Sequence, residues 1–263
     1  MAEPAPLPTE STPVSLAGRR AASGEPIRPN TVLPAVRRWV QLHTADGLAL
    51  EGELALPEGR PPVATMVCLH PLPTHGGSQD SHLFRKAAWR LPALAGIAVL
   101  RFNTRGTAGS EGLFDGGDAE RYDVAAALDL VEAGVDGRSL PAPWLVGWSF
   151  GSELVLRYGY QDDTVVGGIL ISPPLKKAGN ADLAGWAASG KPLVSIVAEY
   201  DDYLRPAEAR DRFARVPQCQ LVEVEGAKHL FVGARYADRV LDEVSARLAP
   251  GSTPLPTFWE PAG

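Results

Sequence analysis

Short apolar segments alternate with stretches of helical periodicity along most of this 263-residue chain, and this alternation constrains the fold more than any other feature. Apolar runs of strand length lie at 63–69, 97–102, 144–147, 165–171, 193–198 and 220–224. Helical patterns separate or follow them at about 80–95 (interrupted by Pro92), 118–133, 150–160, 181–189, 206–215 and up to Leu248. Strands that are apolar on both faces are typical of a parallel sheet between two helical layers. The sequence therefore predicts an α/β fold with a mostly parallel central sheet.

A hairpin is predicted ahead of the first of these strands. Residues 36–43 and 48–56 flank Asp46-Gly47, a pair of residues that favours a tight turn between antiparallel strands. We therefore expect two antiparallel strands at one edge of the sheet.

Proline-rich segments bound this pattern at both ends. Residues 1–34 hold seven prolines and show no hydrophobic period, so too little apolar surface is available to offset the entropy of ordering them. We predict a disordered tail over 1–34, one α/β domain over 35–249 and a C-terminal tail over 250–263. The 45% of apolar residues is enough to fill the core of such a domain.

Composition argues against several classes of function. The formal charge is −6 and no Lys/Arg-rich run occurs, which disfavours nucleic-acid binding. No apolar stretch reaches the ~18 residues of a membrane span, and the first residues do not resemble a secretory signal. Cys68 and Cys219 stand alone in apolar runs and are interpreted as reduced core residues. We expect a cytoplasmic protein without a membrane partner, and nothing in the sequence indicates its oligomeric state.

The segment Gly147-Trp148-Ser149-Phe150-Gly151 lies where a predicted strand passes into a predicted helix. A sharp strand-to-helix turn needs small residues on both sides of its apex, and it exposes the apex hydroxyl above the sheet. The amino end of the helix directs free N–H groups toward the same point. Ser149 is therefore a candidate nucleophile, although a plain tight turn with an exposed serine is the alternative.

A nucleophilic serine needs a base, and the base needs a carboxylate that orients it. His229 is the only histidine after Ser149, and Asp201 lies between them in the chain. Each residue follows the carboxyl end of a different predicted strand, the edge at which sites assemble in parallel sheets. Counting from Ala198 makes Asp201 the acid, whereas counting back from Pro206 selects Asp202, so both remain candidates.

The strand at 63–69 leads into His70-Pro71-Leu72. Proline has no N–H, so the first free amide is that of Leu72, which could stabilise an oxyanion together with the amide of Phe150. His70 is interpreted as a residue that braces this loop, and His75 and Trp148 as candidate substrate contacts.

The polar residues after the strand at 97–102 have structural interpretations. The glycine-rich loop over 103–112 lacks the lysine that phosphate binding would need, so no nucleotide cofactor is predicted. Arg105 is expected to brace loops, and Glu120 and Asp123 to lie at a solvated helix start. No set of residues has metal-ligand spacing, so no metal is predicted either.

Seven motifs occur in an order that resembles the α/β-hydrolase superfamily, in particular its small bacterial members of the dienelactone-hydrolase-like or esterase type. They are HPLPTHGG, LRFNTRG, SEGLFDGG, GWSFG, ISPP, AEYDD and GAKHLF, over about residues 36–248. The resemblance implies Ser149 as nucleophile, His229 as base and Asp201 as acid. It also implies the amides of Leu72 and Phe150 as the oxyanion hole. Ala198, Trp148 and Arg205 depart from the residues that this family often has there.

The resemblance implies an α/β-hydrolase fold and a serine hydrolase that cleaves an ester, or an amide, of a small molecule through an acyl-enzyme. Many relatives carry a lid after the strand that here ends at Ile171, but the next strand region starts at Lys191, 191 − 171 = 20 residues later. No lid domain and an open site are therefore expected, which disfavours long acyl chains. A peptidase or a C–C bond hydrolase could use the same triad. A catalytically silent binding protein on this fold is a third hypothesis.

Overall fold

The computed structural model describes residues 24–260 of the chain. Residues Arg28–Pro256 form one compact unit. The described parts of a second unit, residues 24–27 and 257–260, contain β1 (Glu25–Pro26) and β10 (Phe258–Trp259), which pair antiparallel with each other. The predicted disorder of residues 1–23 lies outside the described residues, and the limits 35 and 249 of the domain stay a prediction.

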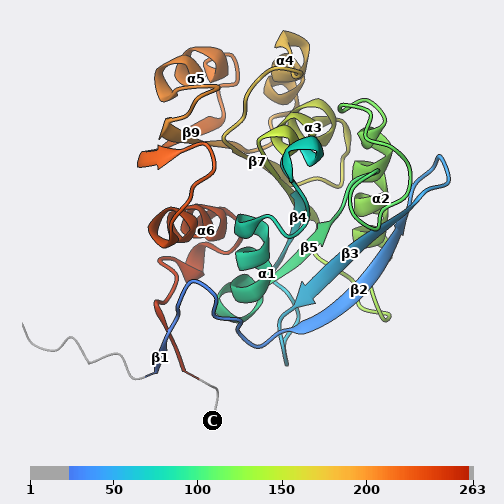
Figure 1. Cartoon of the computed structure of the whole chain (residues 1–263), viewed down its shortest axis with the longest axis vertical. Helices are drawn as coiled ribbons and strands as arrows, with labels where there is room; N and C mark the ends of the chain where they lie inside the picture. Colours follow the sequence, from blue (N-terminus) through green and yellow to red (C-terminus); the bar gives the residue numbers. More distant parts are fainter. Residues whose placement is uncertain (1–23, 261–263) are drawn as a thin grey trace, which may run out of the picture. The chain divides into compact units, whose positions relative to one another are not determined.

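An eight-stranded sheet forms the centre of the larger unit (Figure 1), in the order β2-β3-β5-β4-β6-β7-β8-β9. The strands are β2 (Val36–His43), β3 (Ala49–Leu56), β4 (Ala64–Leu69), β5 (Ile97–Phe102), β6 (Pro143–Trp148), β7 (Gly167–Ile171), β8 (Leu193–Tyr200) and β9 (Cys219–Lys228). The β2–β3 and β3–β5 pairs are antiparallel, and all other pairs are parallel. The predicted mostly parallel sheet with an antiparallel hairpin at one edge is confirmed.

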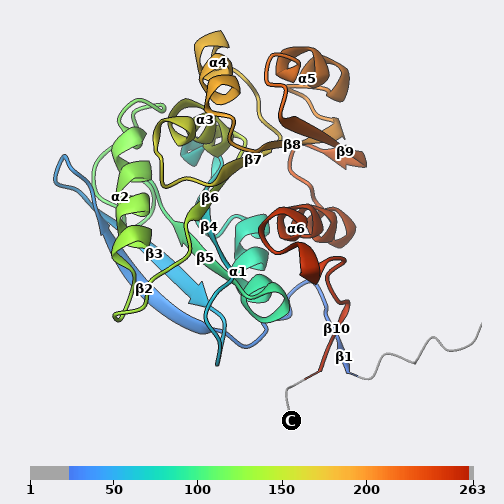
Figure 2. The same cartoon turned by 180° about the vertical axis from the view of Figure 1, so that it is seen from behind.

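Helices cover both faces of this sheet, as predicted (Figures 1 and 2). One face packs against α1 (His82–Ala95) and α6 (Ala234–Leu248). The other packs against α2 (Glu120–Ala133), α3 (Phe150–Tyr158), α4 (Asn180–Ser189) and α5 (Pro206–Phe213). Within residues 24–260 there are also three short 3-10 helices, at Pro73–His75, Gly159–Gln161 and Pro250–Ser252. Within residues 24–260, none of the helices has the length and apolarity of a membrane span.

The helix α1 runs through Pro92, where the sequence predicts an interruption. A proline inside a helix leaves the carbonyl four residues earlier without its usual N–H donor. That carbonyl belongs to Ala88, and the guanidinium of Arg37 donates a hydrogen bond to it at 3.3 Å. A side chain from β2 thus replaces the missing backbone donor, and this compensation is invisible in the local sequence.

Two carboxylates at the start of α2 are buried, so the expectation that Glu120 and Asp123 are solvated is wrong. The Asp123 carboxylate accepts hydrogen bonds from the backbone and side chain of Arg105, at 2.8 and 2.9 Å. Arg105 also pairs with Asp46 in the β2–β3 turn, which confirms its bracing role. Glu120 accepts the amides of Asp115 and Gly117. These partners satisfy the buried charges.

Residues 28–34, assigned from composition to a disordered tail, make defined contacts with the larger unit. The side chain of Leu33 is buried, and its amide donates to the carbonyl of Trp89. The buried guanidinium of Arg90 donates to the carbonyls of Arg28 and Pro29 and pairs with Asp238. One apolar side chain and a few backbone carbonyls produce no periodic signal, so these contacts cannot be predicted from composition.

Two N-terminal truncations should therefore behave differently. Removing residues 1–34 deletes the burial of Leu33, about 1.5–3 kcal/mol, and leaves a buried donor of Arg90 without acceptors. We expect the midpoint of thermal unfolding to fall by roughly 5–10 °C. Removing residues 1–23 should change it by less than about 2 °C, since these residues form no hydrophobic period. Equal midpoints for the two truncations in differential scanning calorimetry would show that residues 28–34 add nothing.

Candidate active site

Ser149 stands at the apex of the turn between β6 and α3. Its φ of 53° lies in the left-handed region, which is uncommon for a residue with a side chain and is found at strained functional positions. A Cβ atom at Gly147 would overlap the carbonyl of Gly151, and one at Gly151 would overlap the carbonyl of Leu69. The two glycines that frame the serine are therefore required by the close approach of the backbone. This turn is the strand-to-helix elbow that the sequence predicts.

His229 lies between Ser149 and Asp201. Its Nε2 atom is 2.9 Å from the Ser149 Oγ atom, and its Nδ1 atom is 2.9 and 3.0 Å from the two carboxylate oxygens of Asp201. The three residues follow the carboxyl ends of β6, β8 and β9, as expected for a site at one edge of a parallel sheet. His229 and Asp201 are 7% and 2% exposed, so solvent barely reaches the bond between them.

Asp201, and not Asp202, faces the histidine. Asp202 is exposed and lines the cavity in front of Ser149. The orientation of Asp201 is fixed locally, because its Oδ1 atom accepts the amide of Tyr203 at 2.9 Å. Counting from Ala198 therefore selects the aspartate that contacts His229, and counting from Pro206 does not.

The Asp201 carboxyl is set up to stay ionised. Burial acts to raise its pKa, but the hydrogen bonds with the His229 ring and the Tyr203 amide outweigh burial and hold the pKa below its usual value. Asp201 is therefore a carboxylate at neutral pH, which is the form that accepts an N–H from Nδ1 of His229 and leaves Nε2 free to take a proton.

The loop after β4 places Leu72 in the wall of the cavity that Ser149 also lines. The buried ring of His70 accepts the Thr104 amide through Nε2 at 3.0 Å, so Nδ1 carries the proton and donates to the Pro71 carbonyl. Burial lowers the pKa of His70 to about 4, which keeps the ring neutral. A Cβ at Gly77 would overlap the Pro71 carbonyl, so the loop is folded tightly on itself. His70 is thus a bracing residue, as the sequence indicates.

A cavity of about 590 Å³ opens in front of Ser149. Its wall includes the two residues whose amides are the candidate oxyanion donors, Leu72 and Phe150. Phe150 is the first residue of α3, and amides of the first helical turn have no acceptor within the helix. His75, expected to contact substrate, also lines this cavity.

Trp148 does not line the cavity, so the expectation that it contacts substrate is not supported. Its indole is buried, and Nε1 donates to the carbonyl of His229 at 3.2 Å. The ring of His82 packs edge-on against this indole and hydrogen-bonds through Nε2 to the carbonyl of Leu230 at 2.8 Å. Two side chains thus hold the backbone of the loop that carries His229.

Sequence reasoning did not assign four polar residues of the cavity wall to the site: Glu153, Lys176, Lys177 and Tyr203. The ring of Tyr203 packs edge-on against the His229 ring, with centroids 4.5 Å apart. Glu153 lies one helical turn after Ser149, and the two lysines are adjacent in a chain that has only five. The spacing of Glu153 from Ser149 and the adjacent pair of lysines are the two sequence features that could have indicated these residues.

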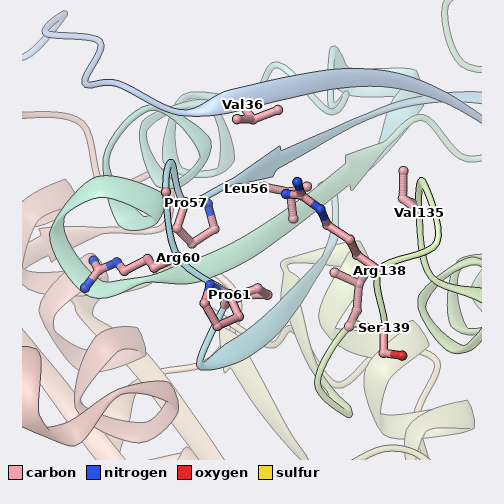
Figure 3. A pocket seen from close by; sticks show the side chains of 11 residues that line it. Val36, Leu56, Pro57, Arg60, Pro61, Val135, Arg138 and Ser139 are labelled. Carbon is pink, nitrogen blue, oxygen red and sulfur yellow. The ribbon is translucent and has the colours of Figure 1, made fainter.

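Figure 3 shows a second cavity, of about 610 Å³, at the ends of β4 and β6 that are opposite to the end where Ser149 follows β6. Its wall comes from the segments that precede β4 and β6 and from the end of β3. The Arg138 side chain extends toward Leu56, whereas that of Arg60 points away from it. This wall contains no histidine or carboxylate beside its single serine, Ser139, so it lacks the groups for nucleophilic catalysis.

Within residues 24–260 no cluster of histidine, cysteine and acidic side chains could hold a metal ion. Cys68 and Cys219 are both free, and burial raises the pKa of the Cys219 thiol to about 12. Cys68 is buried, whereas Cys219 is only partly so. Neither residue lines the cavity in front of Ser149.

Comparison with known proteins agrees with this architecture. A model of the alpha/beta hydrolase family matches residues 66–198, which is about half of the chain and includes Ser149. The chain therefore belongs to the α/β-hydrolase family.

Individual relatives are distant. The chain is 27% identical to a lidless α/β serine hydrolase from Xanthomonas campestris, with a TM-score of 0.65, covering 89% of this chain and all of the other. A Pyrococcus furiosus esterase shares the fold at 18% identity and a TM-score of 0.69, covering 87% and 98% of the two chains. An uncharacterised protein of Rickettsia prowazekii is 26% identical over 191 residues, which is 66% of this chain and 79% of that protein.

Proposed function

We propose that this protein is a serine hydrolase that cleaves an ester of a small molecule through a covalent acyl-enzyme. The observation that carries the proposal is the position of His229, within hydrogen-bond distance of Ser149 on one side and Asp201 on the other. A nucleophile, a base that contacts it and an acid that orients the base are the groups that a serine hydrolase uses for acyl transfer.

In the first half-reaction, Nε2 of His229 takes the Ser149 hydroxyl proton as Oγ forms a bond to the ester carbonyl carbon. The carbonyl oxygen gains the negative charge, and the amides of Leu72 and Phe150 are the proposed donors that stabilise it. The oxyanion then reforms the carbonyl and the C–O bond to the alcohol breaks. His229 returns its proton to the departing oxygen, and Asp201 stays ionised and stabilises the imidazolium.

In the second half-reaction, water replaces the alcohol. His229 takes a proton from the water as its oxygen bonds to the acyl carbon, and the tetrahedral intermediate collapses with release of Ser149. The proton passes back to Oγ, so the products are the free acid and an unchanged enzyme. The left-handed backbone of Ser149 supports this role because it presents the hydroxyl above the sheet throughout.

Labelling with a fluorophosphonate probe tests the proposal, because the probe phosphorylates a serine only when a neighbouring base activates it. We expect stoichiometric labelling at Ser149, found by peptide mass spectrometry, and hydrolysis of p-nitrophenyl butyrate with an initial burst. A protein that is neither labelled nor active would be a binding module on this fold. Labelling without ester hydrolysis would favour a peptidase or a C–C bond hydrolase.

Short esters should be better substrates than long ones. Between Ile171 and Leu193 the chain forms the ten-residue helix α4 and connecting loops. Leu183 and Trp186 of α4 are buried in the hydrophobic core, so the helix packs on the domain. A long acyl chain would therefore leave much of its surface in water. We expect kcat/KM for p-nitrophenyl butyrate to exceed that for the dodecanoate by about tenfold or more. A higher kcat/KM for the dodecanoate, measured below its micellar concentration, would contradict an open site.

A further inference from the structure

Two lysines stand at the rim of the cavity on a loop that a buried carboxylate holds in place. Glu153 of α3 is 2% exposed, and its carboxylate accepts the backbone amides of Lys176, Lys177 and Ala178 at 2.7, 3.1 and 2.5 Å. Three donors satisfy this buried charge, so it is not available to a substrate. The loop between β7 and α4 is thereby pinned to the helix that follows the nucleophile.

The backbone of this loop is held in an unusual conformation. Leu175, just before the lysines, has a φ of 49°, and its side chain is buried. A left-handed conformation of a leucine persists only where surrounding contacts impose it. The direction in which the loop presents Lys176 and Lys177 is therefore determined by the fold.

Neither lysine is neutralised by an acid in the described part of the chain. The Nζ atom of Lys176 lies over the ring of Tyr203, 4.3 Å from its centroid. Asp118 lies near Lys177 but is paired with Arg157 at 2.5 Å. Besides Glu153, Asp202 is the one carboxylate of the cavity wall among residues 24–260, and it forms no ion pair with either lysine there. The two ammonium groups are thus free to bind an anion.

The position of Lys176 relates this charge to the reacting atoms. Its ammonium contacts one face of Tyr203, and the same ring packs against His229. The Lys176 ammonium lies 4.3 Å from the centre of the Tyr203 ring, which lies 4.5 Å from the centre of the His229 ring, so the ammonium is no farther than 8.8 Å from the centre of the imidazole. The formal charge of the whole chain is −6, so the protein does not attract anions at long range. An anion is therefore attracted to Lys176 and Lys177 only when it is close to them.

We propose that the substrate of this site is a small ester that carries an anionic group, such as a carboxylate, a few bonds from the scissile carbonyl, and that Lys176 and Lys177 bind this group. The inference rests on the proposed ester hydrolysis and adds the substrate class to it. Glu153 acts as a positioning residue, because its carboxylate binds the backbone of the loop and does not contact the substrate.

Matched pairs of esters test the substrate class. Mono-p-nitrophenyl adipate and p-nitrophenyl hexanoate have acyl chains of equal length and differ in the terminal carboxylate. 4-(Butyryloxy)benzoate and phenyl butyrate place the same difference in the leaving group. After subtraction of spontaneous hydrolysis, we expect kcat/KM to favour the anionic ester by about fivefold to tenfold in at least one pair, mainly through KM. The preference should shrink as ionic strength rises.

Variants of the two lysines assign the preference to them. Lys176→Gln and Lys177→Gln should each lower it by about threefold, and together remove it, while kcat/KM for the neutral ester changes less than twofold. Arg215→Gln is the matched control, because Arg215 is an exposed cation outside the cavity wall. Asp202→Asn should raise the preference, since it removes the opposing charge.

The outcomes separate this inference from the proposed function. Hydrolysis of the neutral esters with no anionic preference in either pair would overturn the inference and leave the serine hydrolase intact. A preference that survives in the double lysine variant would also overturn it. If neither pair is hydrolysed, the proposed ester hydrolysis fails. Protection of Ser149 from the fluorophosphonate by monoethyl adipate, and its loss in the double variant, would then still decide whether the lysines bind anions.

Discussion

Ser149→Ala should lower kcat for p-nitrophenyl butyrate by about 10⁶-fold and abolish fluorophosphonate labelling, because the members of a catalytic triad act as a unit. The substitution removes one oxygen atom and keeps the side chain that the elbow already accommodates at a φ of 53°. The folded state should therefore survive, and KM for any residual hydrolysis should change little. Hydrolysis is followed at 400 nm, and folding by circular dichroism.

Ser139→Ala is the matched control for this variant. Ser139 is exposed and lines the second cavity, whose wall contains no histidine. We expect labelling and kcat as in the wild-type protein. Hydrolysis by Ser149→Ala near the wild-type rate would rule out the serine mechanism, because the proposed acyl-enzyme forms on the Ser149 Oγ atom.

Asp201→Asn should lower kcat by about 10⁴-fold with a small change in KM, because an amide beside His229 allows the tautomer that places the proton on Nε2. A protonated Nε2 cannot accept the proton of Ser149. The asparagine oxygen can still accept the Tyr203 amide, so the loop geometry should persist. Kinetics on p-nitrophenyl butyrate measure the effect.

Asp202→Asn provides the comparison at the neighbouring position. Asp202 is exposed and makes no contact with the His229 ring like that of Asp201, so kcat for a neutral ester should fall less than about tenfold. A large loss at Asp202 with a small one at Asp201 would reverse the assignment of the acid.

The sequence contains most of what is needed to predict the sheet and the nucleophile. Strands that are buried on both faces, such as β4 and β5, are mostly apolar, so they are visible as near-continuous apolar runs although β4 contains Thr65 and β5 contains Arg101. The elbow around Ser149 is visible because its two glycines answer a local steric requirement. His229 and Asp201 could be proposed since both follow strand ends, although only the structure shows which aspartate contacts the ring.

Interactions between distant segments could not be predicted. Glu120 and Asp123 have the local pattern of a solvated helix start, and their burial depends on partners in other loops. Trp148 adjoins the nucleophile in sequence, yet its side chain points under the site to the His229 loop, 81 residues away. The anchoring of Lys176 and Lys177 by Glu153 likewise joins two elements more than 20 residues apart. The order of the strands in the sheet cannot be predicted from the local composition of each strand.

The residues of the candidate site follow strands of two kinds, an interior strand and an edge strand of the sheet. Ser149 follows β6, which has neighbours on both sides, whereas His229 follows β9, the last strand of the sheet, which among residues 24–260 pairs with β8 alone. Strands with a single neighbour open at a lower free energy than those in the interior. Under mild denaturant, fraying of β9 will therefore separate the base from the nucleophile while the other strands are still paired. As the denaturant concentration rises, enzyme activity should decline before the spectroscopic unfolding transition. An assay of hydrolysis then reports whether β9 is still paired with β8, and not the stability of the whole domain.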